Sequence, residues 1–265
     1  MEQQLYTTAL IVAAFLNMMM AVSLAHNNIW YSEYDVYRRS RLLSALVYLA
    51  FAVGFLFHWY FQWRTSWPAA ASALSLCYFH IGAVLFGWSH TSLLHPGYLT
   101  RRIVVRDLVI LALGIVSYVV PLLSFGAQAT VLPLTGSLAK CGFLIFFLHA
   151  TYIASYFYYT YYRVRRTLKH RLFGDQSPHW WSAQTKHDVL VCHHAFAISC
   201  HLIILFGIGS IAITALLPTL IWPYTLLLAL SIVVFGYIFY SLEAYGNIIE
   251  AATSTTEYAD GTKHD

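Results

Sequence analysis

The sequence predicts an all-α, polytopic membrane protein, a bundle of seven transmembrane helices with the N-terminus outside the cell and the C-terminus in the cytoplasm. Three observations predict this fold class: the composition, the number of long apolar segments and the placement of the basic residues. Of the 265 residues, 59% are hydrophobic and only 10% are charged, whereas soluble domains carry about 25% charged residues. A water-soluble fold of this length could not cover its surface with so few charges.

Seven segments are apolar over about 20 residues, the length that a helix needs to cross the hydrocarbon core. We predict helices rather than strands because a helix satisfies its backbone hydrogen bonds internally, and because the segments are continuous runs without strand-like alternation. The predicted spans lie roughly at residues 5–25, 42–61, 69–90, 104–124, 132–158, 188–217 and 222–248.

The basic residues alternate between the gaps that separate these spans. Basic residues stay on the cytoplasmic side during insertion, so the first, third and fifth gaps are predicted to be cytoplasmic. Twelve of the 15 Lys and Arg residues lie in or at the edge of those three gaps: Arg38, Arg39, Arg41, Arg101, Arg102, Arg106, Arg163, Arg165, Arg166, Lys169, Arg171 and Lys186.

The first four spans each carry a local signal. No Lys or Arg precedes Arg38, so the first segment lacks the basic region of a signal peptide and is expected to remain a span. The second follows Arg41, and the third follows Pro68, a residue favoured at helix starts. The sequence His95-Pro96-Gly97 predicts a turn before the fourth span. Asp107 lies near the start of that helix, where its negative charge interacts favourably with the helix dipole.

The last three spans define the C-terminal half. The fifth ends in a cluster of tyrosines followed by arginines, which predicts a helix that continues beyond the membrane surface into the longest gap, residues 159–187. The seventh opens with Trp222 and Pro223. We therefore divide the chain into a seven-helix domain, residues 1–250, and a short polar cytoplasmic tail, residues 251–265.

Ionisable residues inside a membrane are costly, and they are the first candidates for a functional site. His80, His149 and His201 fall near the middle of the third, fifth and sixth spans, and Lys140 lies in the outer half of the fifth. Three interpretations stay open: neutral histidines hydrogen-bonded between helices, a polar ligand cavity lined by these four residues, or haem or metal ligation by the three histidines. Glu243, near the inner end of the seventh span, is predicted to pair with an arginine.

Five arginines are candidates for a cytoplasmic interface. At the membrane surface they serve either as anchors among lipid phosphates or as a docking surface for a cytoplasmic partner. They are Arg101, Arg102, Arg163, Arg165 and Arg166.

Other function classes find little support. The sequence has no Gly-rich phosphate loop, no Gly-x-Ser-x-Gly elbow and no paired carboxylates at catalytic spacing, so we predict that the chain is not an enzyme. The four cysteines have no Cys-x-x-Cys spacing. No contiguous basic domain lies outside the spans, so direct nucleic-acid binding is not expected. We predict no cofactor. Haem or metal binding is expected only under the alternative in which His80, His149 and His201 are ligands.

The stretch from Trp67 to Asp107 resembles a bacterial family of multi-helix membrane sensor regions. The residues that carry the resemblance are the run from Ala73 to Gly82, the run from Leu85 to Asp107 and the basic element from Arg163 to Phe173. Such regions precede a helix-turn-helix regulator domain or a histidine kinase.

The resemblance implies a sensor or receptor-like module that binds a small ligand, or senses the membrane, and signals to a cytoplasmic partner. The bacterial inner membrane is then the expected location. The partners would be the bilayer, a cytoplasmic signalling protein and a second copy of the chain. The alternatives are a haem- or metal-binding redox protein and a small transporter or channel.

Overall fold

The computed structural model describes residues 1–26, 35–125, 137–173, 183–217 and 219–261, and these form an all-α protein. Seven of the helices are long and apolar enough to cross a membrane, so the chain is a multi-pass membrane protein. The helices are α1 (Glu2–His26), α2 (Asp35–Phe61), α3 (Trp63–Ser66), α4 (Pro68–Leu94), α5 (Arg101–Phe125), α6 (Ser137–Phe173), α7 (Ala183–Leu216) and α8 (Trp222–Gly261).

The helices match the predicted spans in order and number but extend beyond them. The predicted continuation of the fifth span past its tyrosines is confirmed, because α6 runs to Phe173. The short helix α3 was not expected. Helix α8 also continues through residues 251–261, where we expected a polar tail, because each further helical residue adds one backbone hydrogen bond to an existing helix. Residues 132–136 and 262–265 lie outside the described ranges.

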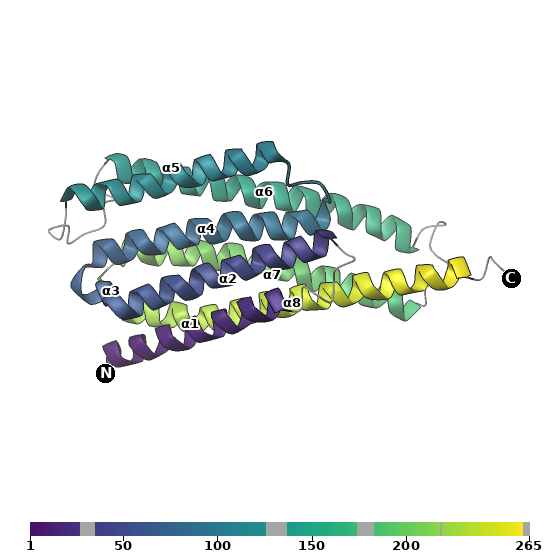
Figure 1. The fold of residues 1–265 in the computed structure, drawn as a ribbon, viewed down its shortest axis with the longest axis horizontal. Helices are drawn as coiled ribbons and strands as arrows, with labels where there is room; N and C mark the ends of the chain where they lie inside the picture. Colours follow the sequence, from purple (N-terminus) through teal and green to yellow (C-terminus); the bar gives the residue numbers. More distant parts are fainter. Residues whose placement is uncertain (27–34, 126–136, 174–182, 218, 262–265) are drawn as a thin grey trace.

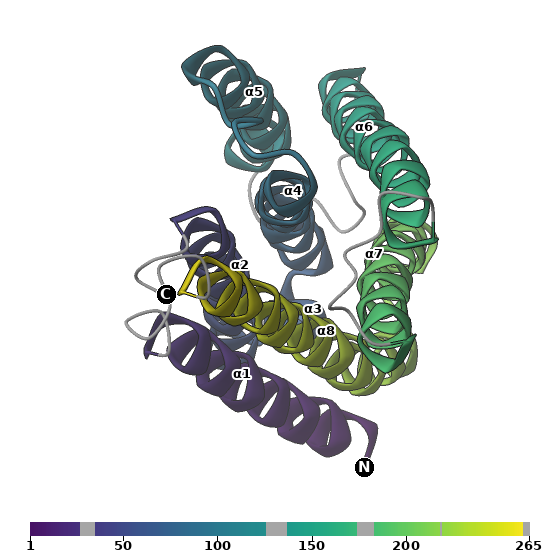
Figure 2. The ribbon, with the colours of Figure 1, turned by 90° about the vertical axis from the view of Figure 1, so that its right-hand side faces the viewer.

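The long helices lie side by side along one axis, with the start of α1 and the end of α8 at opposite ends of the bundle (Figure 1). We call the end that carries Glu2 and α3 the N-end, and the end that carries the last turns of α6 and α8 the C-end. Seen along the axis, α4 lies in the centre, with α5 and α6 on one side and α1, α2 and α8 on the other (Figure 2). Helix α4 contacts α2, α5, α6 and α7, whereas the backbones of α6 and α7 lie further apart and the two helices meet through side chains such as Tyr158 and His201.

The interior combines a large aromatic and aliphatic core with buried small and polar side chains, while other large apolar side chains face outward. In α1 the amide of Asn17 is fully buried, whereas Phe15 is 62% exposed. Between α2 and α4 the Ser89 hydroxyl lies 2.8 Å from the hydroxyls of both Ser40 and Ser44. This distribution suits a lipid solvent, in which apolar surface carries no penalty and interhelical contacts rely on close packing and hydrogen bonds.

Glycines allow the closest helix contacts. A Cβ atom at Gly54 would lie 2.5 Å from Cδ1 of Tyr78, and one at Gly87 would overlap the Ile153 side chain. Both glycines belong to the small-residue pairs of the sequence, Ala50/Gly54 and Ala83/Gly87, which is the spacing that lets helices approach closely. Helix α4 is therefore packed tightly against α2 and α6 at these points.

An ion pair joins α2 to α8 toward the C-end. Arg41 is fully buried, and its Nη1 donates to Oε2 of Glu243 at 2.8 Å and to the Tyr37 hydroxyl at 3.1 Å. Tyr37 in turn donates to the Leu242 carbonyl. The prediction that Glu243 pairs with an arginine is confirmed, and the partner comes from the first basic cluster of the sequence.

Candidate functional site

A connected set of polar side chains lies where α4, α5 and α6 meet. His80 of α4 and Asp107 of α5 are fully buried, and His149 of α6 is 4% exposed. We call these three residues, together with Arg106, the polar chain. Two of its members, His80 and His149, were candidate ligand residues from the sequence, and the structure places them in direct contact.

The distances between the ring nitrogens and the carboxylate are consistent with one assignment of the histidine protons. Nε2 of His80 lies 3.1 Å from Nδ1 of His149, and Nε2 of His149 lies 3.4 Å from Oδ1 of Asp107. If both histidines are neutral and protonated on Nε2, His80 donates to His149, and the N–H of His149 faces the carboxylate as a contact that falls short of hydrogen-bond geometry. We assign these tautomers because they place a donor opposite an acceptor at each step.

Asp107 is the centre of the polar chain. Its Oδ2 accepts a hydrogen bond from the Trp88 indole at 2.8 Å, and its Oδ1 accepts from Nε of Arg106 at 2.8 Å. Arg106 also donates to the hydroxyl of Tyr152 at 2.9 Å. A carboxylate removed from water needs such partners, because an uncompensated buried charge costs several kcal/mol. The guanidinium of Arg106 therefore supplies a counter-charge next to the buried carboxyl group.

His80 ends the polar chain inside the bundle. Its ring stacks on Phe146 with 4.7 Å between the centroids. On the other side, a Cβ atom at Gly114 would lie 2.8 Å from Nδ1 of His80, so only glycine leaves room for this ring position. Nδ1 has no hydrogen-bond partner among the described residues. The position of this imidazole is thus fixed by packing against Phe146 and Gly114.

A lateral groove of about 360 Å³ opens next to the polar chain, between α5 and α6. Ligand sites commonly enclose about 300–1,000 Å³. The groove combines apolar walls with three polar side chains, Arg106, His149 and Tyr152, so its chemistry is amphipathic. It is lined by Arg106, Ile110, Ile145, Leu148, His149 and Tyr152.

The polar chain is also connected to the turn between α4 and α5. The predicted turn at His95-Pro96-Gly97 is present, with Gly97 at φ 86°. Tyr98 is buried in a small cluster with Trp88, and its ring stacks on Tyr156 of α6 at 5.0 Å. Burial, with the Asp107 carboxylate as a lesser cause, raises the pKa of the Tyr98 phenol above its ordinary value. Trp88 and Tyr98 thus join the buried carboxylate to the C-end of the bundle.

Two other candidate ligand residues lie elsewhere. His201 is on the outward face of α7, where Nδ1 bonds to the Ala197 carbonyl of its own helix and the ring packs against Tyr158. Lys140 is exposed near the start of α6. The structure therefore does not bring these residues together with His80 and His149. His201 lies apart from the other histidines because the packing of α7 turns a different face of this helix toward the interior.

The five candidate interface arginines are at or near the C-end of the bundle. Arg101 and Arg102 are exposed in the first turn of α5, and Arg163 and Arg166 are exposed on α6. Arg165 is half-buried and lies 3.4 Å from Nε2 of His194 on α7. The exposed guanidinium groups form a basic rim at this end.

Asp107 is the member of the site that the sequence reasoning missed. From the sequence it was interpreted only as a residue that interacts favourably with the helix dipole, and it was not among the candidate site residues. The available signal was its position inside the predicted span 104–124, where an acidic residue is costly unless it has a buried partner. Its partner Trp88 was not identifiable, because the contact joins two different helices.

The haem or metal alternative requires ligands that converge. Of its three histidines, His80 and His149 meet and His201 does not. Within the part of the chain that the structure describes, no group of three His, Cys, Asp or Glu side chains is arranged to hold a metal ion. Comparison of the chain with protein-family models, curated proteins and solved structures found no match.

Proposed function

We propose that this protein is a membrane sensor that binds a small amphipathic molecule in the lateral groove and signals to a cytoplasmic protein. The observation that carries the proposal is the wall shared by the groove and the buried polar chain. Arg106 and His149 line the groove and also contact Asp107. A ligand that hydrogen-bonds to Arg106 or His149 therefore competes directly with the buried carboxylate of Asp107, which connects α5 to α4 and α6.

The lining of the groove defines the class of ligand. Ile110, Ile145 and Leu148 suit an aliphatic chain, while the guanidinium of Arg106 suits a carboxylate or another anionic head group. Outward-facing apolar residues such as Leu148, which is 57% exposed, surround the opening. A molecule dissolved in the bilayer would therefore reach the groove without passing through water.

The route to the cytoplasmic side follows from the contacts of Asp107. A change in its hydrogen bonds acts on Trp88, on the adjacent Tyr98 and, through the stacked Tyr156, on α6. Helix α6 continues as one helix to Phe173 and carries the part of the basic rim formed by Arg163 and Arg166. A rotation or shift of α6 would thus change the surface that a protein bound at the C-end contacts.

One second candidate has a specific observation in its favour. A buried carboxylate in line with two histidines can pass a proton, and such chains occur in proton-coupled transporters. The polar chain supplies that element through Asp107, His149 and His80. Substrate flux in proteoliposomes that depends on a pH gradient would favour this function over a sensor.

The orientation we propose is N-end outside and C-end in the cytoplasm, because the exposed arginines gather at the C-end. An epitope tag before α1 is expected to be labelled in intact cells, and a tag after α8 only after permeabilisation. A cytoplasmic tag of known location serves as the permeability control. Labelling of both tags on the same side would contradict an odd number of spans.

Ligand binding in the groove is tested with a fatty acid and with a substitution that fills the groove. In nanodiscs, a medium-chain fatty acid such as decanoate is expected to raise the Tm, and the matching alcohol, decanol, to raise it less, because only the carboxylate pairs with Arg106. Leu148→Trp places an indole in the groove and should abolish most of the response. Leu144→Trp is the matched control, since Leu144 is 55% exposed on α6 and does not line the groove. Equal responses of the two variants would rule out this site.

A further inference from the structure

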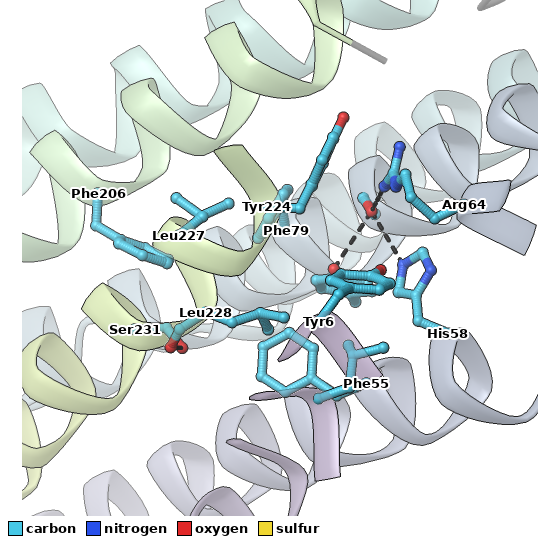
Figure 3. A pocket seen from close by; sticks show the side chains of 13 residues that line it. Tyr6, Phe55, His58, Arg64, Phe79, Phe206, Tyr224, Leu227, Leu228 and Ser231 are labelled. Atoms are coloured by element: carbon cyan, nitrogen blue, oxygen red, sulfur yellow. Dashed lines mark hydrogen bonds between the residues drawn. The ribbon is translucent and has the colours of Figure 1, made fainter. Parts of the chain in front are cut away.

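A second polar site lies at the N-end of the bundle, separate from the lateral groove. It is a cavity of about 20 Å³, which is room for one species of about the size of a water molecule. Its walls come from α1, α2, α4, α7 and α8, and α3 contributes Arg64, which lies at one side of the cavity with His58, Tyr6 and Tyr224 (Figure 3).

Arg64 is directed into the bundle by the link between α2 and α4. Gln62 adopts a left-handed backbone conformation with φ 50°, so the chain reverses and α3 turns inward. The Arg64 side chain is consequently 2% exposed. Its guanidinium lies 3.6 Å from the ring centroid of Tyr224 and donates to the hydroxyls of Ser72 and Ser75. A positive charge is thus held inside the N-end.

The hydroxyl of Ser75 has more donors around it than it can accept. It donates its own proton to the Ala71 carbonyl at 2.9 Å, which leaves two lone pairs. Three groups lie within hydrogen-bond distance of it: Nη2 of Arg64 at 3.2 Å, the Tyr78 hydroxyl at 3.3 Å and Nε2 of His58 at 3.1 Å. The arrangement therefore leaves donor capacity directed at the cavity.

His58 adds to this excess of donors. It is 2% exposed and lines the cavity, and its Nδ1 has no hydrogen-bond partner among the described residues. A neutral histidine always carries one N–H group. On Nε2 this group competes for Ser75, and on Nδ1 it has no described acceptor.

The surrounding charges favour an anion. Among the described residues that line the cavity, Arg64 carries a full charge and none has a carboxylate. Tyr224, in the first turn of α8, also lines the cavity, and the N-terminal end of a helix carries partial positive charge. An anion accepts hydrogen bonds from these donors and is also attracted by the guanidinium, whereas a water molecule gains only the hydrogen bonds.

We propose that this cavity binds one small monovalent anion of halide size, held by Arg64 and the neighbouring hydroxyl and imidazole donors. The volume excludes polyatomic anions such as sulfate or gluconate. Binding would tie α3 to the helices that line the cavity and so stabilise the N-end. The site does not depend on the function proposed for the groove, because none of its lining residues is shared with the groove.

The test replaces gluconate by chloride at constant ionic strength in a nonionic detergent. The Tm is expected to rise by about 5 °C with a saturable dependence on chloride, and bromide should act similarly. Arg64→Gln should abolish the rise. Arg102→Gln, which removes an exposed arginine at the C-end, should keep it. The same rise in Arg64→Gln, or no rise in the wild type, would overturn the proposal.

A second measurement covers the case in which Arg64→Gln does not fold. Crystals of the wild-type protein grown in bromide are expected to give an anomalous peak in the cavity beside Arg64. Electron density for a water without anomalous signal, at a bromide concentration that saturates any Tm response, would show that the cavity holds solvent only and would overturn the proposal.

Discussion

Replacement of Asp107 by alanine is expected to lower the free energy of unfolding by about 3–5 kcal/mol, because it removes one partner of a buried charge network. Asp107 is fully buried and accepts hydrogen bonds from both Trp88 and Arg106. Without the carboxylate, Trp88 loses its acceptor and Arg106 loses its counter-charge. The cost arises from these unsatisfied groups more than from the lost contacts themselves.

The measurement is thermal or chemical unfolding of the detergent-purified protein. Asp188→Ala provides the control, since the Asp188 side chain is 58% exposed and such substitutions typically change stability by less than about 0.5 kcal/mol. The double variant Asp107→Asn with Arg106→Gln removes both charges and should be more stable than Asp107→Ala. If Asp107→Ala unfolds like the wild type, Asp107 does not organise the contacts of α4, α5 and α6.

Glu243→Gln is expected to be the second strongly destabilising substitution, again by about 3–5 kcal/mol. It leaves the fully buried guanidinium of Arg41 without the carboxylate that lies 2.8 Å away. Arg41→Met should cost less, about 2 kcal/mol, because the Glu243 side chain is 26% exposed and can turn away from the interior.

A double-mutant cycle measures the coupling directly. The variant Arg41→Met with Glu243→Gln removes both charges, so it should recover part of the stability lost in Glu243→Gln. The pair Arg38 and Asp35 is the matched control: it has the same 2.8 Å separation, but its side chains are 39% and 61% exposed. Its removal should cost less than about 1 kcal/mol. A coupling energy no larger than that of the surface pair would contradict a structural role for the buried one.

Much of the fold was predictable because hydropathy and charge are properties of local sequence. The seven apolar segments and the extension of α6 past its tyrosines were found this way. The C-terminal end of α8 and the short helix α3 were not. Helix α3 depends on the left-handed conformation of Gln62, which hydropathy does not reveal.

The candidate site was predictable only in part. His80 and His149 were identified because a histidine inside a span is costly and therefore noticeable. The sequence could not show that they bond to each other, or that His201 faces outward on α7. It also did not single out Arg64, which sits in a gap between spans where an arginine is ordinarily solvated.

By itself the sequence determined the class of protein, the order of the spans and the alternation of basic gaps, because the bilayer acts on each segment separately. Only the tertiary structure decided which face of each helix turns inward. Helices such as α1 and α4 are apolar around most of their circumference, so no periodicity marks the buried side. Contacts such as those of Asp107 with His149, or Arg41 with Glu243, depend on the packing of helices that are far apart in the chain.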